Sequence, residues 1–285
     1  MASMRDIKRR KESIQSTGQI TKAMKLVATV KLQKARTRAE MSKPYFDHMY
    51  TTVASMLAKT GDIDYKYLKA GNSKKKAIIV ITSNRGLAGG YNSNITKLIP
   101  GGDSPKEDIV LYTVGNKGKD ALSRRGYTIA GDYSDVINEP LYTDAMNIGE
   151  AVLKGFEADE FGEIYLAYTS FKNTVSHEPK LVKLLPIDKS AAGESSDGDL
   201  TLMNYEPEET QALDVIIPKY IYSLIYGALV EAVASENGAR MQAMDSATSN
   251  ADDMISSLTL MYNRARQGSI TQELTEIIAG AEAIS

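Results

Sequence analysis

The 285-residue sequence contains no cysteine and only two histidines, His48 and His177. Without cysteine the chain has no disulfide, no thiol nucleophile and no cysteine-ligated metal, and two histidines do not supply a histidine-rich metal site. Long apolar runs are also missing. The most apolar stretch, YIYSLIYGALVEAVA, follows Lys219 and is interrupted by Glu231, so it falls short of the roughly 18 residues of a membrane span. The first residues, MASMRDIKRR, lack an apolar signal core, so we expect a soluble, intracellular protein.

A strong net charge is lacking as well, because the formal net charge is only -2, but the two ends of the chain differ. Residues 1–40 carry 11 Lys and Arg against 3 Asp and Glu, whereas residues 219–285 carry 4 against 8. Such an asymmetry either recruits an external polyanion or lets the two ends attract each other. A nucleic-acid partner is disfavoured, because no aromatic residues are interleaved with the basic ones and the basic segment carries an apolar stripe that needs a protein partner. Pairing of the two ends explains both features.

Proline is missing from two long segments. Residues 1–43 contain none, and their apolar residues recur at helical spacing, so we expect an N-terminal helix that Pro44 bends or interrupts. No proline follows Pro218 to the end of the chain, where apolar and small residues recur every three or four positions. A continuous helix of that length would extend about 100 Å at ~1.5 Å per residue, which is typical of a coiled coil or a shaft. We therefore predict a long antiparallel coiled coil between the two terminal helices.

Between these helices, short apolar runs alternate with turns. The runs predict strands at Ala77–Thr82, Ile109–Val114, Ile164–Ser170 and Leu181–Leu185, and helical stretches follow Leu87, Gly118 and Tyr142. This alternation indicates an α/β domain with a mostly parallel sheet. We expect an N-terminal coiled-coil helix over residues 1–58, a central α/β domain over 75–205 and a C-terminal coiled-coil helix over 209–285. The stretch SAAGESSDGDL, residues 190–200, is expected to be a mobile loop.

Two glycine-rich turns follow predicted strands. NRGLAGGYN, residues 84–92, lacks the lysine and hydroxyl residue of the GxxxxGK[ST] phosphate loop and also fails the GxGxxG dinucleotide fingerprint. GNKGKD, residues 115–120, carries lysines at the wrong spacing. Backbone amides at a helix N-terminus can bind an anion unaided, so an α/β phosphate- or nucleotide-binding enzyme with coiled-coil arms remains the main alternative. Ordinary strand-to-helix turns explain both stretches better.

A catalytic constellation is absent from the sequence. Asp252 and Asp253 lie in the helical C-terminal pattern, and three further acids lie in the preceding linker, where solvated charge is the expected role. His177, in the stretch SHEP, is expected to be a turn residue. No arrangement supplies a nucleophile, a base and an orienting group together, so we expect no catalytic, cofactor or metal site.

The last segment, RARQGSITQELTEIIAGAEAIS, keeps its apolar residues in helical step. They are Ile270, Leu274, Ile277 and Ile278. The N-terminal helix is the shorter of the two, so this end is expected to extend beyond its partner. A frayed tail would be more polar, and we therefore expect this end to insert into another protein.

Three stretches resemble the γ subunit of F-type ATP synthases: MRDIKRRKESIQSTGQITKAMKLVATVKL, TSNRGLAGGYNSN and YNRARQGSITQELTEIIAGAEA. The resemblance spans essentially the whole chain in the same order, and ITQELTEIIAGAEA is its most specific part. It implies a rotor shaft that performs no bond chemistry, with paired terminal helices inside a ring of α and β subunits and a Rossmann-like α/β domain below. The partners it implies are α, β, ε and the membrane c-ring.

The resemblance also implies six partner-contact residues. Met24 matches the position that faces the β-subunit lever loop, and Ala88 lies in the turn that approaches the same lever. Arg240 and Gln267 match positions that bond to the β catch loop. Thr271 and Glu273 match the polar pair of the signature segment.

The cysteine-bearing insert of chloroplast relatives is absent, and with no transit peptide visible the resemblance favours a bacterial protein. It would be present in a single copy per complex, bound peripherally to the cytoplasmic side of the cell membrane without inserting into it, with no nucleic acid and no cofactor. A second alternative is a coiled-coil adaptor or chaperone unrelated to ATP synthesis. Co-migration with α and β subunits from native membranes separates that alternative from the rotor, and tight ATP binding by the chain alone would favour the enzyme.

Overall fold

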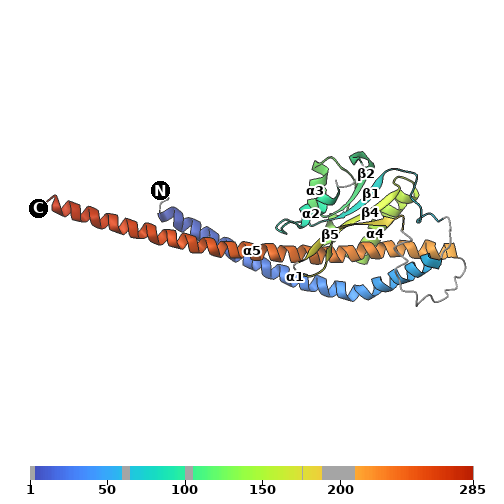
Figure 1. The fold of residues 1–285 in the computed structure, drawn as a ribbon, viewed down its shortest axis with the longest axis horizontal. Helices are drawn as coiled ribbons and strands as arrows, with labels where there is room; N and C mark the ends of the chain where they lie inside the picture. The colour runs from blue at the N-terminus through green and yellow to red at the C-terminus, as the bar shows by residue number, and fades with distance from the viewer. Residues whose placement is uncertain (1–3, 60–64, 100–104, 175, 188–208, 285) are drawn as a thin grey trace. The chain divides into compact units, whose positions relative to one another are not determined.

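The computed structural model describes residues 4–59, 65–99, 105–174, 176–187 and 209–284 (Figure 1). The chain forms two compact units, one built from residues 1–28 and 241–285 and the other from residues 29–240. Two long helices, α1 (Met4–Lys59) and α5 (Glu209–Glu282), contribute to both units. The stretch 190–200, expected to be a mobile loop, lies outside the described residues. The division at residues 1–58, 75–205 and 209–285 stays a prediction.

In the first unit, α1 and α5 lie side by side and run antiparallel. Lys25 Nζ donates to Asp245 Oδ1 at 2.6 Å, and one turn earlier on α1 the hydroxyls of Thr21 and Thr248 are 2.8 Å apart. A further turn back, a Cβ on Gly18 would lie 3.4 Å from the Cβ of Ala251. Residue numbers fall along α1 while they rise along α5. The predicted pairing of the terminal helices is therefore confirmed, and small residues allow the close approach.

Gly18 gives a test of this close approach. We expect Gly18→Ala to raise the free energy of unfolding by up to about 1 kcal/mol, because alanine favours the helix and its methyl group only reaches ordinary contact with Ala251. Gly18→Leu should instead lower it by about 1–3 kcal/mol through overpacking. Thermal unfolding followed by circular dichroism would measure both variants. Equal stability of the two variants would contradict the predicted contact.

Pro44 was predicted to bend or interrupt the N-terminal helix, and interruption is wrong, because α1 is continuous through this proline. A proline inside a helix removes one backbone hydrogen bond, and packing on the flanks can hold the helix together. Phe46 supplies such packing: a Cβ on Gly227 of α5 would lie 3.4 Å from its ring, and the rings of Phe46 and Tyr226 meet edge to face at 6.1 Å.

The second unit contains a five-stranded sheet in the order β3-β2-β1-β4-β5. The strands are β1 (Lys76–Ile81), β2 (Ile109–Val114), β3 (Thr128–Asp132), β4 (Glu163–Phe171) and β5 (His177–Leu185). All neighbours pair in parallel except β4 and β5, which are antiparallel, so the predicted mostly parallel sheet is confirmed. Strand β3 was not predicted, because it is short, contains Gly131 and has no continuous buried run.

Helices cover both faces of this sheet (Figure 1). They are α2 (Tyr91–Leu98), α3 (Asn116–Arg124) and α4 (Tyr142–Glu157), with short 3-10 turns η2 (Lys106–Asp108) and η3 (Ser134–Asn138) between them. Along β1 the side chains alternate. Ile79 and Ile81 belong to the core formed with α4 and α5, whereas Ile78 and Val80 pack with α2 and α3. The near-continuous apolar sequence of β1 follows from this burial on both sides.

The first half of α5 is a core helix of the second unit. Leu213, Ile217, Ile221, Ile225 and Leu229 are fully buried, at steps of four residues. Among the described residues, α5 also contains the one helix stretch, within Gln211–Ala281, that is long and apolar enough to cross a membrane by length and composition, and 44% of its apolar window is buried in the protein. A core helix has the same composition, so this property alone does not indicate a membrane span.

Candidate functional site

The carboxyl ends of β1 and β4 mark the topological switch point of the sheet. The chain proceeds from β1 to β2 and β3 on one side and then returns through α4 to β4 on the other. In open α/β sheets, ligands bind outside the carboxyl ends of the strands at such a point. The occupant of this position therefore decides whether the domain can act as a nucleotide-binding enzyme.

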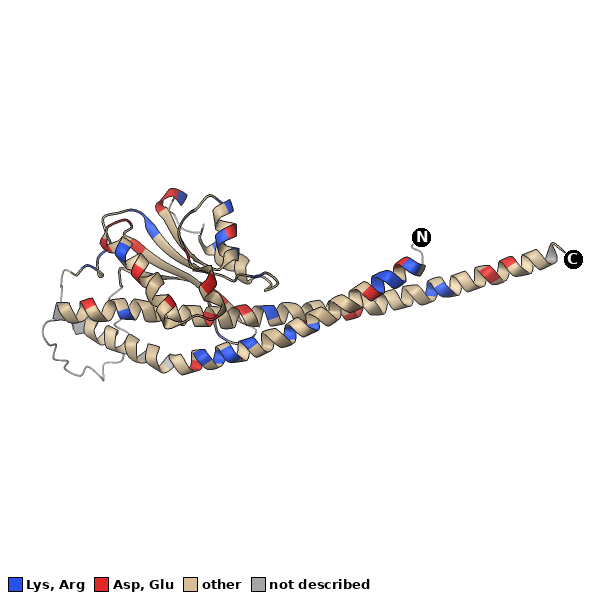
Figure 2. Ribbon diagram, turned by 180° about the vertical axis from the view of Figure 1, so that it is seen from behind, with Lys and Arg blue, Asp and Glu red and all other residues tan. Residues whose placement is uncertain are grey.

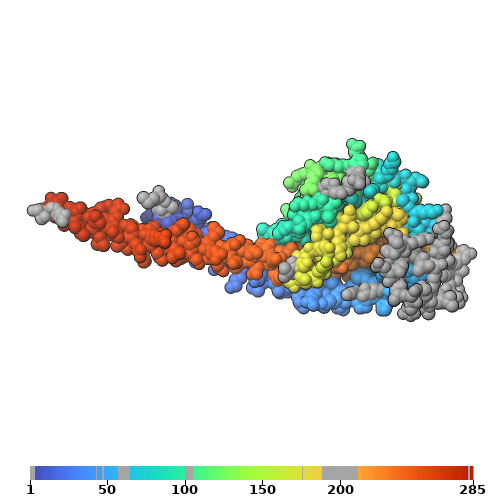
Figure 3. Space-filling model, viewed as in Figure 1, coloured from blue at the N-terminus to red at the C-terminus, as the bar shows by residue number. Residues whose placement is uncertain are grey.

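Helix α5 occupies this position. Ser235 Oγ donates to the carbonyl of Thr169, which lies in β4, and the amide of Phe171 donates to Glu231 Oε2 at 3.2 Å. From the start of α2, beyond the turn that follows β1, the Tyr91 hydroxyl donates to the carbonyl of Ala232 at 3.2 Å. Figure 3 shows the β4–β5 hairpin (yellow) lying over α5 (orange) on the visible face. The chain's own helix thus fills the place where a ligand would bind.

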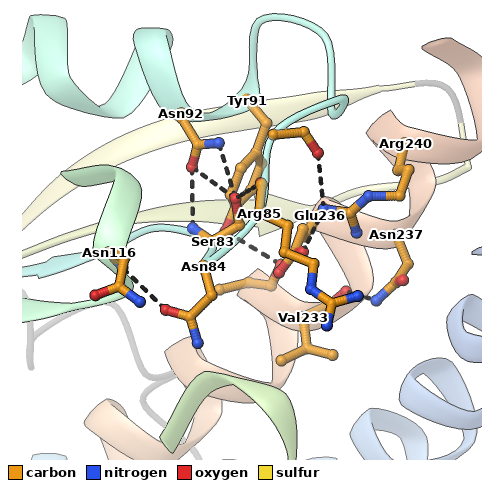
Figure 4. Close-up of polar contacts among 12 residues, drawn as sticks. Ser83, Asn84, Arg85, Tyr91, Asn92, Asn116, Val233, Glu236, Asn237 and Arg240 are labelled. Carbon is orange, nitrogen blue, oxygen red and sulfur yellow. Dashed lines mark hydrogen bonds and ion pairs between the residues drawn. The ribbon is translucent and has the colours of Figure 1, made fainter. Parts of the chain in front are cut away.

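The turn NRGLAGGYN is held by hydrogen bonds to Ser83 just before it and to neighbouring elements (Figure 4). The Ser83 amide donates to Asn92 Oδ1 at 2.9 Å, Asn92 Nδ2 donates to Ser83 Oγ at 2.8 Å, and Ser83 Oγ is 2.6 Å from the carbonyl of Arg85. Asn84 bridges outward, because its amide donates to the Ser134 carbonyl and its oxygen accepts from the amide of Asn116. These bonds fix the turn between β1, η3 and α3, and the polar side chains are used for that purpose.

The tip of this turn combines a buried alanine with an exposed leucine. Ala88 is 2% exposed, so a larger side chain would disturb its packing. Leu87 adopts a φ of 61° and is 62% exposed, and Gly89 has a φ of 55°. A bulky residue rarely adopts a positive φ unless its surroundings enforce it. The surrounding hydrogen bonds therefore hold the tip in one defined conformation.

Arg240 of α5 joins the turn to the helix (Figure 4). Its Nη2 lies 2.7 Å from Glu236 Oε1 and 3.4 Å from the carbonyl of Gly86. Both side chains of the ion pair are only 13% exposed. Burial raises the pKa of Glu236 above its ordinary value, and the neighbouring charges of Arg240 and Lys31 act in the opposite direction. The two residues are one helical turn apart on α5, and Arg240 links the turn NRGLAGGYN to this helix.

The second glycine-rich turn, residues 115–120, lets α3 pack closely against the end of β1. Gly115 has a φ of 104°, and a Cβ there would lie 2.2 Å from the carbonyl oxygen of Thr82. The amide of Gly118 donates to Thr82 Oγ1 at 2.9 Å, and Lys119 Nζ is 2.6 Å from Asp132 Oδ2. The glycines allow α3 to approach β1 closely, and Lys119 is engaged by a carboxylate. Helix α3 also begins earlier than predicted, at Asn116.

His177 is the first residue of β5, so its predicted placement in a turn is wrong. The antiparallel pairing with β4 extends the strand back from the predicted start at Leu181, because Phe171 pairs with His177. A Cβ on Gly238 of α5 would lie 2.6 Å from the imidazole ring, so the ring packs closely on the helix. Burial lowers the pKa of His177, which suits a packing role for the neutral ring.

A further polar cluster ties the segment after α1 to two helices. Tyr65 donates to Asp214 of α5 at 2.8 Å, and Lys66 and Tyr67 contact Glu157 at the end of α4 at 2.8 and 2.6 Å. Burial raises the pKa of Tyr67 to about 12, and the bonds from Lys66 and Tyr67 lower the pKa of Glu157. This cluster was not predicted, because Glu157 and Asp214 lie far along the chain from residues 65–67 and the residues match no motif.

The predicted partner-contact residues fall into separate places. Ala88 and Arg240 lie in the same region of the second unit, since Arg240 contacts the turn that contains Ala88. Met24 is half-buried on α1, and Gln267, Thr271 and Glu273 are exposed on α5. Within this last group, Thr271 Oγ1 donates to the carbonyl of Gln267 at 2.9 Å. Glu236 and Tyr91 were missed, although the spacing of Glu236 and Arg240 in SENGAR is typical of a helical ion pair.

The end of α5 exposes the apolar residues that the sequence singled out. Ile270, Leu274, Ile277 and Ile278 are between 49% and 67% exposed. Figure 2 shows few charged residues along this part of the helix. Such a concentration of exposed apolar side chains indicates an interaction surface. Among the described residues, no group of three or more His, Cys, Asp and Glu could hold a metal ion.

Comparison with known proteins gives consistent matches over the whole chain. The sequence model of the family described as ATP synthase matches residues 3–284. The ATP synthase gamma chain of Lachnoclostridium phytofermentans is 74% identical over 291 residues, covering 100% of both chains. The sodium ion specific ATP synthase gamma chain of Acetobacterium woodii is 42% identical over 299 residues, covering 99% of both.

Solved structures of similar fold come from mitochondrial ATP synthases. A chain of the OSCP/F1/c-ring structure of the Euglena gracilis enzyme has a TM-score of 0.70 at 18% identity and covers 99% of this chain and 94% of its own length. That likeness concerns the fold. A chain of the central stalk and c-ring structure of the Tetrahymena thermophila enzyme has a TM-score of 0.57 at 25% identity, covering 80% of this chain and 99% of its own.

Proposed function

This chain belongs to the ATP synthase gamma chain family and is a central-stalk subunit of an F-type ATP synthase, and from this premise we propose that it is a bacterial rotor shaft without a catalytic site of its own. It couples ion-driven rotation of the membrane c-ring to ATP synthesis or hydrolysis at the β subunits. Coupling of this kind needs a stiff body whose movement changes the equilibrium at distant sites, and no chemistry within the shaft.

One observation carries the non-catalytic assignment: α5 fills the switch point of the sheet. Ser235 and Glu231 bond to the carboxyl end of β4, and Ala232 bonds to Tyr91 at the start of α2, just beyond the turn that follows β1. The usual ligand position of an α/β enzyme is therefore taken by the chain itself. This argues against the alternative of a nucleotide-binding enzyme with coiled-coil arms and supports a role in which the sheet anchors the shaft.

The proposed partners are the α and β subunits of the hexameric ring, the ε subunit and the c-ring, with a single copy of this chain per complex. Nucleic acid and cofactors take no part. The protein is peripheral to the cell membrane on its cytoplasmic side. The apolar first half of α5 supports peripheral placement. Its residues Leu213, Ile217 and Ile221 are buried in the core of the protein and do not face lipid.

The contact residues have distinct roles in this proposal. Met24 faces the β lever, and Ala88 supports the turn that approaches the same lever. Arg240 and Gln267 donate hydrogen bonds to the β catch loop. Thr271 and Glu273 add polar contacts beside the exposed apolar end of α5, which inserts into the ring.

Reconstitution tests the proposal. The chain is mixed with α, β and ε subunits, and co-migration, ATP hydrolysis and rotation are measured. We expect a stable complex and ATP-driven rotation, and the variant Gln267→Ala should rotate roughly fivefold more slowly, within the usual range of coupling between sites. Because Gln267 is exposed, the melting temperature of the isolated chain should not change.

The matched control is Gln211→Ala, which removes another exposed glutamine at the opposite end of α5. It should leave rotation unchanged. Failure of the wild-type chain to co-migrate with α and β would overturn the rotor assignment. Tight binding of ATP to the isolated chain would favour the enzyme alternative.

A further inference from the structure

Glu236 and Arg240 form an ion pair that is unusually well shielded for a helix surface. The 2.7 Å contact joins residues four apart on α5, and each side chain is only 13% exposed. Two other ion pairs at this kind of spacing, Arg9–Asp6 and Arg36–Glu40, have side chains that are more than half exposed. Exposed pairs of that kind contribute little to stability. The shielded pair calls for a separate explanation.

Because Glu236 is shielded from water, its carboxylate needs the positive charge of Arg240 beside it. A buried carboxylate is costly unless it is paired and hydrogen-bonded, and burial opposes the ionised form of Glu236. Arg240 supplies the compensating charge, with Lys31 of α1 as a more distant contributor. A packed apolar residue would fill the same space at lower cost. A buried pair at this place therefore indicates that the orientation of one of its members matters.

The geometry shows which member is oriented. Both contacts of the guanidinium, to Glu236 Oε1 and to the Gly86 carbonyl, are made by Nη2. Nη1 and Nε of Arg240 bond to no residue in the described part of the chain. A guanidinium carries five donors in a rigid plane, so fixing one nitrogen at two acceptors fixes the direction of the others. Figure 4 shows Arg240 held between the turn and α5.

We propose that Glu236 is a positioning residue that holds Arg240 so that its remaining donors meet a carboxylate or carbonyl group of a β subunit. The inference rests on the proposed function. The Gly86 carbonyl is the second support, and it is itself fixed because the turn is held by the Ser83–Asn92 bonds and by the buried Ala88. A pre-oriented guanidinium loses less conformational freedom on each encounter, so it can bond and release as the shaft turns.

A double-mutant cycle in the reconstituted complex tests this inference. The variants are Glu236→Gln, Arg240→Gln and the two combined, and the readouts are the rotation rate of the complex and the melting temperature of the isolated chain. We expect Glu236→Gln to slow rotation roughly fivefold, as for loss of a coupling contact. Arg240→Gln should slow it at least as much, and the combined variant should be no slower than Arg240→Gln alone, because Glu236 acts through Arg240.

The exchanged variant, Glu236→Arg with Arg240→Glu, separates positioning from stability. It retains an i,i+4 ion pair, so the melting temperature should lie close to that of the wild type, while rotation stays slow because the cation is displaced by one turn. Glu236→Asp keeps the charge but shortens the side chain, and it should recover rotation only in part.

Two results would overturn the inference while the rotor assignment stands. In the first, the wild-type complex rotates normally, and the combined variant is slowed by the product of the two single-variant factors. This would show that Glu236 acts independently of Arg240. The other is recovery of both rotation and melting temperature in the exchanged variant, which would show a purely structural pair. If the wild-type chain does not assemble with α and β, the proposed function is overturned and the inference with it.

Discussion

Gly115→Ala is expected to lower the free energy of unfolding by about 3 kcal/mol, through backbone strain and overlap together. The φ of 104° is unfavourable for alanine, and the new Cβ would lie 2.2 Å from the carbonyl oxygen of Thr82. That oxygen belongs to backbone at the end of β1, so it cannot turn away as a flexible side chain could. Urea unfolding followed by circular dichroism measures the loss.

Gly126→Ala is the matched control. Gly126 also has a positive φ, 84°, but a Cβ there would meet nothing within 4 Å. This variant should cost only about 1 kcal/mol, the strain alone. The difference between the two variants isolates the contact of α3 with β1. Equal losses would show that the overlap at Thr82 relaxes freely.

The second large effect is expected at Ile225 of α5. This side chain is fully buried, and its Cδ1 lies 3.5 Å from the position of a Cβ on Gly149 of α4. Ile225→Ala should lower the free energy of unfolding by about 3 kcal/mol, because the lost transfer energy is joined by the cost of a cavity. The melting temperature and the urea midpoint of the isolated chain should both fall.

Ile277 gives the contrasting case on the same helix. It is 67% exposed, so Ile277→Ala should leave the stability of the isolated chain nearly unchanged. Under the proposed function it should instead weaken assembly with α and β, since the exposed apolar end inserts into the ring. A loss of stability at Ile277 comparable with that at Ile225 would contradict this separation of folding from assembly.

The features that could be predicted are those with a long, regular pattern. The terminal helices were visible from helical spacing and missing proline, and β1 from its continuous apolar run. Strand β3 was not predicted, because TIAGD is short and its burial alternates without a strong apolar signal. The start of β5 at His177 depends on pairing with Phe171, which is a tertiary contact that local sequence does not express.

Pro44 shows the converse error. Its intrinsic tendency to break a helix is real, yet packing of Phe46 against α5 overrides it. At the candidate site, the failure of NRGLAGGYN to match a phosphate loop could be judged from spacing alone. The role of its polar residues could not be predicted from the sequence. Asn84 bonds to Ser134 and Asn116, which come close to it only in the folded domain.

The helix at the switch point also determines how the domain responds to free ligands. Because α5 is covalently part of the chain, it acts as a tethered occupant, and tethering gives a group an effective concentration in the millimolar range or above. A dissolved nucleotide would have to outcompete this occupant and its bonds to Thr169, Phe171 and Tyr91 together. A nucleotide bound at this edge of the sheet would therefore have to displace part of the chain itself.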